Sequence, residues 1–205
     1  AAGVEVGQLT APDGVEDAVL AWLRAVKLQR PHVTLKFAQT LDGFTAAADG
    51  TSQWITGPKA REWVHADRAR RDAIIIGTGT ALADNPSLTA RNGDGSLREH
   101  QPRRVVIGKR ELQAAGEKAS HLQQLGFEQY DTIEGALKEL YASGARNVLV
   151  EGGAGLAQSF IEAGVVDALA AYIAPILLGQ GRGVLANTVA NTLDEEPLGN
   201  KLRTI

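Results

Sequence analysis

Residues 146–164 constrain the fold most, because a short apolar run there meets a glycine cluster and a helical pattern begins directly after it. Residues 147–150 have the length and composition of a buried strand, and Glu151 stands at its carboxyl end. Apolar residues then recur at helical spacing, at Leu156, Phe160 and Ala163. A strand followed at once by a helix predicts an α/β domain, with this junction at the carboxyl edge of its sheet.

Gly152, Gly153 and Gly155 leave the turn between this strand and helix with little side-chain bulk. Such a turn lets the backbone approach a ligand, and the unpaired N–H groups of the first helical turn favour a phosphate. A plain strand-to-helix turn would use the same glycines for close packing, so the turn alone leaves both interpretations open. Glu151 favours a ligand site, because a carboxylate at the mouth of a buried strand is costly unless it contacts a ligand or a cation.

Apolar runs and helical patterns alternate along the rest of the chain. Strands are predicted at residues 32–38, 72–77, 104–108 and 167–178, and helices at residues 15–29, 56–71, 114–124 and 131–141. Several of the strands are continuous apolar runs, which predicts a mostly parallel sheet covered on both faces. Ligands of such sheets lie at the carboxyl ends of the strands. The GxGxxG fingerprint is missing, so a second glycine turn at residues 77–80 would share any dinucleotide with the first.

Composition limits the classes of function. The 205 residues are 44% hydrophobic, enough for one sizeable core, and a net charge of −3 argues against a general nucleic-acid binder. Residues 59–110 carry 11 basic and 6 acidic side chains, which suits an anionic ligand, although a solvated helix face usually explains such an imbalance. Because cysteine is absent, disulfides and thiolate sites are excluded, and no metal site is predicted. We expect a cytoplasmic protein without a membrane span or targeting signal.

Three blocks of sequence resemble the reductase domain of the bacterial riboflavin-biosynthesis protein RibD. They are VTLKFAQTLDGFTAAADGTSQWITG at residues 33–57, GTGTALADNPSLTAR at 77–91 and VEGGAGL at 150–156. The resemblance implies a dihydrofolate-reductase-like fold, a three-layer α/β sandwich with a mostly parallel central sheet and helices on both faces. It also implies an NADPH-dependent enzyme of riboflavin biosynthesis, which reduces the ribosyl group of 5-amino-6-(5-phosphoribosylamino)uracil to a ribityl chain.

The resemblance also implies a domain organisation. The full-length family protein carries an N-terminal zinc deaminase, whose His-x-Glu and Pro-Cys-x-x-Cys signature does not occur in this sequence. We therefore expect residues 1–30 to be a linker and helix that follow a missing deaminase domain, and residues 31–205 to be the reductase domain. The expected partners are a small-molecule phosphoribosylaminopyrimidine substrate and a second copy of the chain in a homodimer, with no nucleic acid and no membrane.

Site residues follow from the resemblance at the positions that match. Contacts with the NADP cofactor are implied at Ala38, Trp54, Thr80, Asp84, Gly152, Gly153, Ala154, Gly155 and Leu156. Contacts with the substrate are implied at Ser52, Arg68, Leu88, Arg91 and Glu151. A guanidinium binds phosphate bidentately, so the two arginines suit the ribose phosphate. Many relatives have a small polar cofactor contact at residues 108–110, where this chain reads Gly-Lys-Arg, so Lys109 or Arg110 is left to recognise the 2′-phosphate.

Lys36 and Glu151 are the predicted catalytic residues. Opening of the glycosylamine ring gives an imine that accepts hydride from NADPH, while a proton reaches the nitrogen or the ring oxygen. We expect these two residues to orient the opened ribose and assist proton movement, and Asp42 to shape the loop beside them. From the residues alone, Lys36 is better explained as a strand lysine that reaches solvent, and Asp42 as a turn residue; the resemblance is what favours a catalytic role for Lys36. His65 is expected on a helix surface.

Two other functions would keep the same glycine turns. A related NADPH reductase acting on another pterin-like or pyrimidine substrate should not need both Arg68 and Arg91. A non-catalytic nucleotide-binding module would bind NADPH without turnover. The variant Glu151→Gln distinguishes these alternatives, because a catalytic carboxylate is needed for turnover and not for binding the cofactor.

Overall fold

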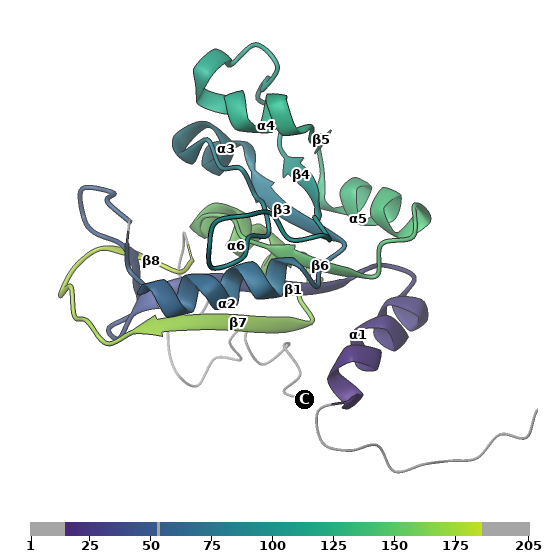
Figure 1. Cartoon of the computed structure of the whole chain (residues 1–205), viewed down its shortest axis with the longest axis horizontal. Coiled ribbons are helices and arrows are strands. Elements are labelled where there is room, and N and C mark those ends of the chain that lie inside the picture. Colours follow the sequence, from purple (N-terminus) through teal and green to yellow (C-terminus); the bar gives the residue numbers. More distant parts are fainter. Residues whose placement is uncertain (1–14, 53, 186–205) are drawn as a thin grey trace, which may run out of the picture.

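The central element of the computed structural model, which describes residues 15–52 and 54–185, is a six-stranded parallel sheet (Figure 1). Its strand order is β5-β4-β3-β6-β1-β7. The strands are β1 (His32–Thr40), β3 (Ala73–Gly77), β4 (Arg103–Ile107), β5 (Glu128–Tyr130), β6 (Asn147–Val150) and β7 (Ala168–Ala174). A separate antiparallel pair joins β2 (Phe44–Ala46) to β8 (Arg182–Gly183).

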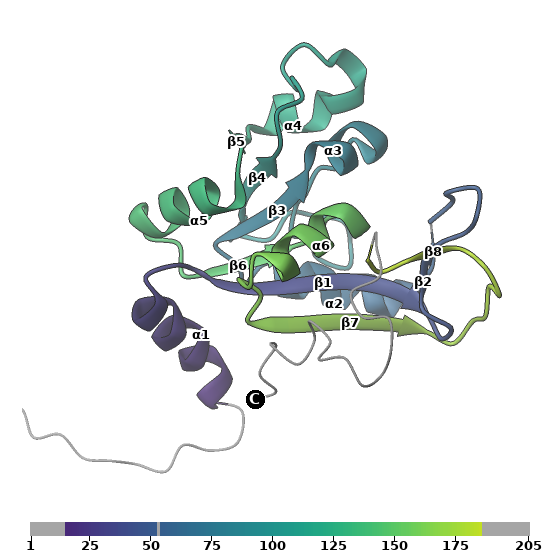
Figure 2. The same cartoon turned by 180° about the vertical axis from the view of Figure 1, so that it is seen from behind.

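Helices cover both faces of the sheet. They are α1 (Val15–Leu28), α2 (Pro58–Arg68), α3 (Thr78–Asp84), the 3-10 helix η1 (Gly116–Ala119), α4 (Ser120–Leu125), α5 (Ile133–Ala142) and α6 (Ala154–Glu162). Helix α2 lies in front of the sheet in Figure 1, and α6 lies in front of it in the reverse view of Figure 2. The predicted three-layer α/β sandwich is therefore confirmed. None of the described helices is both long and apolar enough to cross a membrane.

The core has two parts because successive strand residues point to opposite faces of the sheet. On one face, strand residues pack against α5 and α6, and the buried side chains include Val33, Leu35, Ile75, Val105, Leu137, Leu140 and Phe160. On the other face they pack against α3, η1 and α4, through Ile74, Ile76, Val106, Leu149, Leu88, Leu112 and Leu122. Both faces of the central strands are thus covered, which explains their continuous apolar sequence.

The register of the parallel strands brings the two predicted catalytic residues to the same edge of the sheet. Leu35 of β1 pairs with Val150 of β6, and Ile75 of β3 pairs with the same valine. The next residues along β1 and β6 are Lys36 and Glu151, which therefore reach the carboxyl edge together. Both point away from the α5 and α6 face, since Leu35 and Val150 are buried on it.

The segment between α1 and β1 is fixed to the sheet by one carboxylate. Both terminal nitrogens of Arg30 donate to Asp167, at 2.6 and 2.9 Å, and the Val33 amide donates to the same carboxylate at 2.8 Å. This pair joins residues on either side of the predicted boundary at residue 30. Residues 1–14 of the predicted linker, and residues 186–205 of the predicted reductase domain, lie outside the described residues.

Short elements differ from the prediction. Strand β5 was not predicted, the turn at residues 77–80 opens helix α3, and the predicted helix 114–124 is divided into η1 and α4. The predicted strand 167–178 ends as β7 at Ala174, because Pro175 has no N–H to continue the ladder. Strands of three residues and helices of one or two turns contain too few residues to show a period.

Replacing Phe160 tests the core between α6 and the sheet. Phe160 is among the largest fully buried side chains, so Phe160→Ala is expected to lower the free energy of unfolding by about 3–5 kcal/mol. Its neighbour Ser159 is exposed and bonds only within the helix, so Ser159→Ala is the matched control, with a change of about 0.5 kcal/mol or less. Urea unfolding followed by circular dichroism measures both; equal effects would contradict this packing.

Candidate active site

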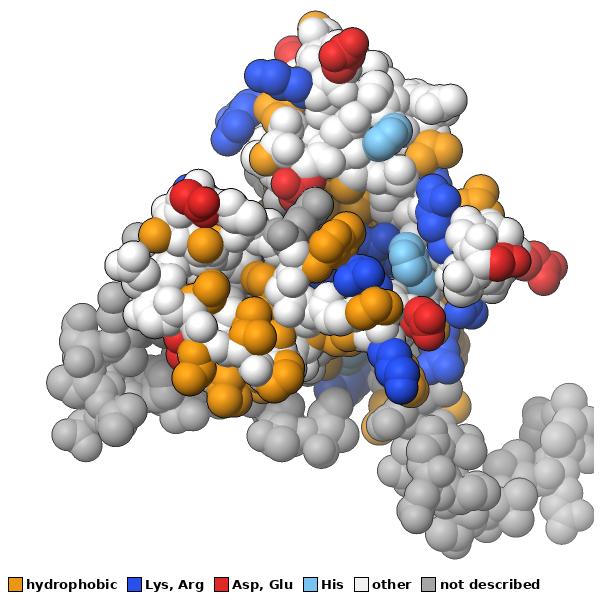
Figure 3. Space-filling view, turned by 60° about the vertical axis from the view of Figure 1, so that its left-hand side comes forward, with side chains coloured by type: hydrophobic (Ala, Val, Ile, Leu, Met, Phe, Trp, Pro, Cys, Tyr) orange, Lys and Arg blue, Asp and Glu red, His pale blue; other side chains and the backbone are white. Residues whose placement is uncertain are grey.

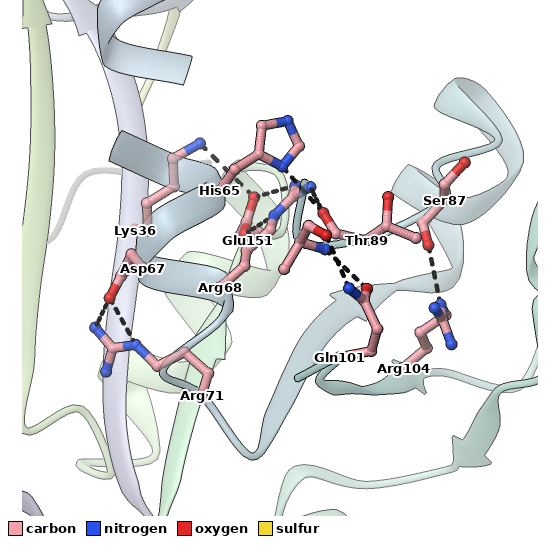
Figure 4. A network of polar contacts seen from close by, with 11 residues as sticks. Lys36, His65, Asp67, Arg68, Arg71, Ser87, Thr89, Gln101, Arg104 and Glu151 are labelled. Carbon is pink, nitrogen blue, oxygen red and sulfur yellow. Dashed lines mark hydrogen bonds and ion pairs between the residues drawn. The ribbon is translucent and has the colours of Figure 1, made fainter. Parts of the chain in front are cut away.

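A buried carboxylate forms the centre of the carboxyl edge of the sheet. Arg68 of α2 donates to both oxygens of Glu151, from Nε at 2.7 Å and from Nη2 at 2.9 Å (Figure 4). Lys36 Nζ lies 3.8 Å from Glu151 Oε2. Only 7% of the Glu151 side chain is exposed, so its charge is compensated almost entirely by these two cations. The structure thus brings together the two predicted catalytic residues and one predicted substrate residue.

The charges of this cluster stabilise one another. Burial by itself raises the pKa of Glu151, but the positive charges of Arg68 and Lys36 outweigh it and hold that pKa below its usual value. Burial by itself would lower the pKa of Arg68, and the attraction of Glu151 outweighs it and raises that pKa. Glu151 is therefore ionised at neutral pH. Breaking a buried pair of this kind leaves an uncompensated charge and costs about 3–5 kcal/mol.

The backbone carbonyl of Thr89 joins His65 to this cluster. It accepts hydrogen bonds from Arg68 Nη1 and from His65 Nδ1, each at 3.1 Å (Figure 4). Burial, and then the charge of Arg68, lowers the pKa of His65, so its ring is neutral at pH 7 with the proton on Nδ1. His65 was predicted as a helix-surface residue; it lies half-buried on α2, with its ring bonded to the Thr89 carbonyl. Its partner is 24 residues away, and no local pattern in the sequence indicated this bond.

Tyr172 of β7 is a second residue that sequence analysis missed. Lys36 Nζ lies 5.6 Å from the centroid of its ring, within range of a cation–π contact. Ala38, a predicted cofactor contact, pairs with Tyr172 in the register of β1 and β7. Burial raises the pKa of Tyr172, with smaller contributions from the nearby carboxylates of Asp67 and Glu151. The phenol therefore stays protonated beside Lys36 and remains a hydrogen-bond donor.

The two glycine turns meet beside the cluster. The Gly153 amide donates to Thr80 Oγ1 at 3.2 Å, so α3 and α6 begin next to each other. The N-terminus of α6 has no side-chain cap. A methyl group on Gly152 would lie 2.4 Å from Leu156 Cδ2, whereas one on Gly153 or Gly155 would meet almost nothing. Gly152 is thus required for packing, and Gly153 and Gly155 leave space for a ligand.

An aromatic groove lies at the carboxyl end of β7, and Tyr172 in its lining also contacts Lys36. It has a volume of about 850 Å³ and is lined by residues that include Trp54, Arg61, Tyr172 and Pro175. Trp54 is 69% exposed, and the Cζ atom of Arg61 lies 4.5 Å from the centroid of its ring. Figure 3 looks onto this side of the molecule, where basic and histidine side chains gather near the centre of the face. An exposed indole beside a groove is suited to stacking on a planar ligand.

Four other predicted site residues lie outside the cluster of Lys36, Glu151 and Arg68. Leu88 is buried, and Arg91 Nε donates to Thr89 Oγ1 at 2.9 Å, so both belong to the loop that contacts Arg68. Asp84 lies at the end of α3, one helical turn beyond Thr80. Ser52 is exposed after β2, and among the described residues no hydrogen bond joins it to the cluster.

Asp42 lies in the turn after β1 and shapes the loop, as predicted. Its carboxylate accepts a hydrogen bond from the hydroxyl of Thr40 and from the amides of Leu178 and Gly179. These bonds hold the turn against the segment that follows β7. No group of three or more histidine and acidic side chains that could hold a metal ion occurs within residues 15–52 and 54–185.

The charge of Glu151 predicts a pH dependence of stability. Because its pKa is lower in the folded chain than the value of about 4.3 in the unfolded chain, the ionised carboxylate stabilises the fold above that pH. This contribution is lost as the pH falls through the folded pKa. The difference in unfolding free energy between wild type and Glu151→Gln should therefore be largest near pH 7 and shrink below about pH 4.3.

Urea unfolding at a series of pH values measures this difference. Glu99→Gln is the matched control, because Glu99 is exposed and has no ion pair in the described structure, so its effect should be small at every pH. A difference for Glu151→Gln that does not change with pH would contradict the ionised state of this carboxylate.

Several known proteins resemble this chain in sequence and in fold. The family model for the RibD C-terminal domain matches residues 31–195. Riboflavin biosynthesis protein RibD of Corynebacterium ammoniagenes is 69% identical over 192 residues, which cover 94% of this chain and 57% of that protein. A structure of Acinetobacter baumannii RibD is 31% identical, with a TM-score of 0.75 over 88% of this chain and 56% of that one.

A third protein carries a descriptive name. It is the diaminohydroxyphosphoribosylaminopyrimidine deaminase/5-amino-6-(5-phosphoribosylamino)uracil reductase of Thermotoga maritima, 29% identical, with a TM-score of 0.68 over 87% of this chain and 54% of that one. The chain thus spans slightly more than half the length of these relatives. The family match over residues 31–195 covers the part that holds the cluster and the glycine turns. The chain belongs to the RibD C-terminal domain family.

Proposed function

We propose that this chain catalyses the reductase step of riboflavin biosynthesis, the NADPH-dependent reduction of the ribosyl group of 5-amino-6-(5-phosphoribosylamino)uracil. The observation that carries the proposal is the buried cluster of Lys36, Glu151 and Arg68 beside two glycine turns. The name of the Thermotoga maritima relative supports the substrate. The deaminase activity in that name is not assigned to this chain, because its signature does not occur in these 205 residues.

The cofactor fits the edge where α3 and α6 begin. The uncapped first turn of α6 and the open space at Gly153 and Gly155 suit a pyrophosphate. Arg110 Nη2 lies 3.8 Å from where a methyl group on Gly79 would be, at the start of α3. We assign Arg110 to the 2′-phosphate, which favours NADPH over NADH. Trp54 lines the groove along β7, and Ala38 pairs with Tyr172, whose ring centroid lies 5.6 Å from Lys36 Nζ.

The substrate is held by the same cluster. Three of the five N–H donors of Arg68 are engaged, two with Glu151 and one with Thr89, so its main role is to orient Glu151. Arg91 has fewer fixed partners and is the better residue for the ribose phosphate. Glu151, in turn, accepts hydrogen bonds from the hydroxyl groups of the opened sugar.

Lys36 supplies the proton. The reaction adds one hydride and one proton to the glycosylamine, and the hydride comes from the nicotinamide when it is bound. As the bond between the anomeric carbon and the ring oxygen breaks, the ammonium of Lys36 donates a proton to that oxygen. Glu151, 3.8 Å away, stabilises the ammonium and holds it in place before the transfer. The homodimer remains a prediction from the resemblance, and the cytoplasmic location remains a prediction from the sequence.

The proposed roles predict the effects of two substitutions. Lys36→Met and Glu151→Gln should each lower kcat by roughly 100-fold or more, because each removes a group that assists proton transfer or orientation. Lys138→Met is the matched control, since Lys138 is an exposed lysine of α5, and it should behave as wild type. The assay follows NADPH absorbance with the phosphoribosylaminouracil substrate. If the wild type binds NADPH but does not oxidise it, the chain is a nucleotide-binding module instead.

The cofactor site predicts a second effect. In Gly153→Ala the added methyl group meets only Thr80 Oγ1, at 3.7 Å, so the fold should tolerate it while the pyrophosphate loses its close approach. We expect the Kd for NADPH to rise about 10-fold or more, with little change in Tm. Gly93→Ala, also in open space and at an ordinary φ, is the control. Unchanged NADPH binding in Gly153→Ala would place the pyrophosphate elsewhere.

A further inference from the structure

The loop of residues 87–91 has a strained conformation that its own sequence does not explain. Leu88 has a φ of +49°, in the left-handed region, which costs a residue other than glycine about 1 kcal/mol or more. Its side chain is nevertheless buried in the core beneath α3 and α4. A strained, buried turn persists only where the surrounding structure fixes it. Besides the donors from α2, three side chains from outside the loop bond to it: Arg98, Gln101 and Arg104.

Gln101 holds the loop through a reciprocal pair of hydrogen bonds. Its Oε1 accepts from the amide of Ala90 at 3.0 Å, and its Nε2 donates to the carbonyl of Ala90 at 2.8 Å (Figure 4). Nε2 also donates to the carbonyl of Arg98 at 2.7 Å. The primary amide thus imitates the backbone of a neighbouring strand. Arg104 adds one bond, from Nε to the carbonyl of Ser87 at 2.9 Å.

Ala90 directly follows the residue whose carbonyl joins the active-site cluster. The Thr89 carbonyl accepts from both Arg68 and His65, and the Thr89 hydroxyl accepts from Arg91. A shift of the Ala90 peptide would move this carbonyl and release both donors. Arg68 would then keep its contact with Glu151 but lose the third bond that fixes the plane of its guanidinium. The Gln101 amide therefore acts on the cluster through one intervening residue.

We propose that Gln101 is a positioning residue for the reductase site: it clamps the loop of residues 87–91 so that the Thr89 carbonyl orients Arg68 and His65, and Thr89 Oγ1 orients Arg91. The inference rests on the proposed function for its effect on catalysis, and on the structure alone for its effect on His65. Gln101 touches neither Glu151 nor Lys36 in the described structure, so its contribution comes only through the loop.

Steady-state kinetics of Gln101→Ala and Gln101→Glu test this role. Gln101→Glu keeps the acceptor for the Ala90 amide but loses both donated bonds and places a carboxylate beside two carbonyls. Each variant should lower kcat/KM for the sugar-phosphate substrate by about 10–100-fold, because an error of about 1 Å in position has effects of that size. The Kd for NADPH should be unchanged, since the glycine turns lie on other elements.

Gln123→Ala is the matched control. Its Nε2 also donates to backbone carbonyls, those of Leu112 and Gln113, and so anchors a loop in the same way but away from the cluster. It should lower Tm by an amount similar to Gln101→Ala and leave kcat/KM within about 2-fold of wild type. If Gln101→Ala and Gln123→Ala change kcat/KM equally, Gln101 is only structural and the proposal fails.

A second measurement does not require turnover. Nitrogen-15 NMR of the His65 ring should show the Nδ1-protonated tautomer in wild type and in Gln123→Ala, and a mixture of tautomers in Gln101→Ala. An unchanged His65 tautomer in Gln101→Ala would overturn the inference whether or not the enzyme is active. Conversely, if the tautomer changes in Gln101→Ala but the wild type does not turn over the substrate, the clamp is supported and the proposed function is refuted.

Discussion

The functional edge of this protein depends on one buried ion pair, between Glu151 at the end of β6 and Arg68 on α2. A carboxylate that is almost fully buried is tolerated only because both of its oxygens receive charge-assisted bonds and Lys36 lies 3.8 Å away. Each of the three side chains comes from a different element. The pair therefore fixes β1, β6 and α2 relative to one another, and none can shift without exposing an uncompensated charge.

Several of the polar groups around this ion pair belong to the backbone. The Thr89 carbonyl receives two donors from α2, and the N-terminus of α6 at Gly153 has no side-chain cap. Backbone groups on a packed scaffold have little freedom to reorient, so a site built from them is preorganised before a ligand arrives. The strained φ of Leu88 is consistent with a loop fixed by tertiary contacts.

The sequence left two interpretations of the glycine turn after β6, close packing and ligand binding. The three glycines differ in which of these they suit. Gly152 serves packing, because any side chain there would collide with Leu156, whereas Gly153 and Gly155 border open space. Packing therefore accounts for Gly152, whereas the ligand-binding role of Gly153 and Gly155 stays a prediction. The hydrogen bond from Gly153 to Thr80 also brings the second glycine turn beside the first, as a shared dinucleotide site requires.

The sequence by itself determined the long elements, the parallel α/β class and, through the family resemblance, the three charged residues of the cluster. Long apolar runs and helical repeats are visible locally, because their period is set by backbone geometry. Strand β5 and helix α3 were missed because they are too short to show a period.

Only the tertiary structure decided which groups meet. Arg68 and Glu151 are 83 residues apart, and the register that puts Lys36 beside Glu151 is set by pairing between whole strands. Likewise, the hydrogen bond of His65 to Thr89 and the clamp of Gln101 on Ala90 depend on partners outside any local window. A side chain's charge and shape are written in the sequence, but its partner, burial and pKa arise only when distant segments pack together.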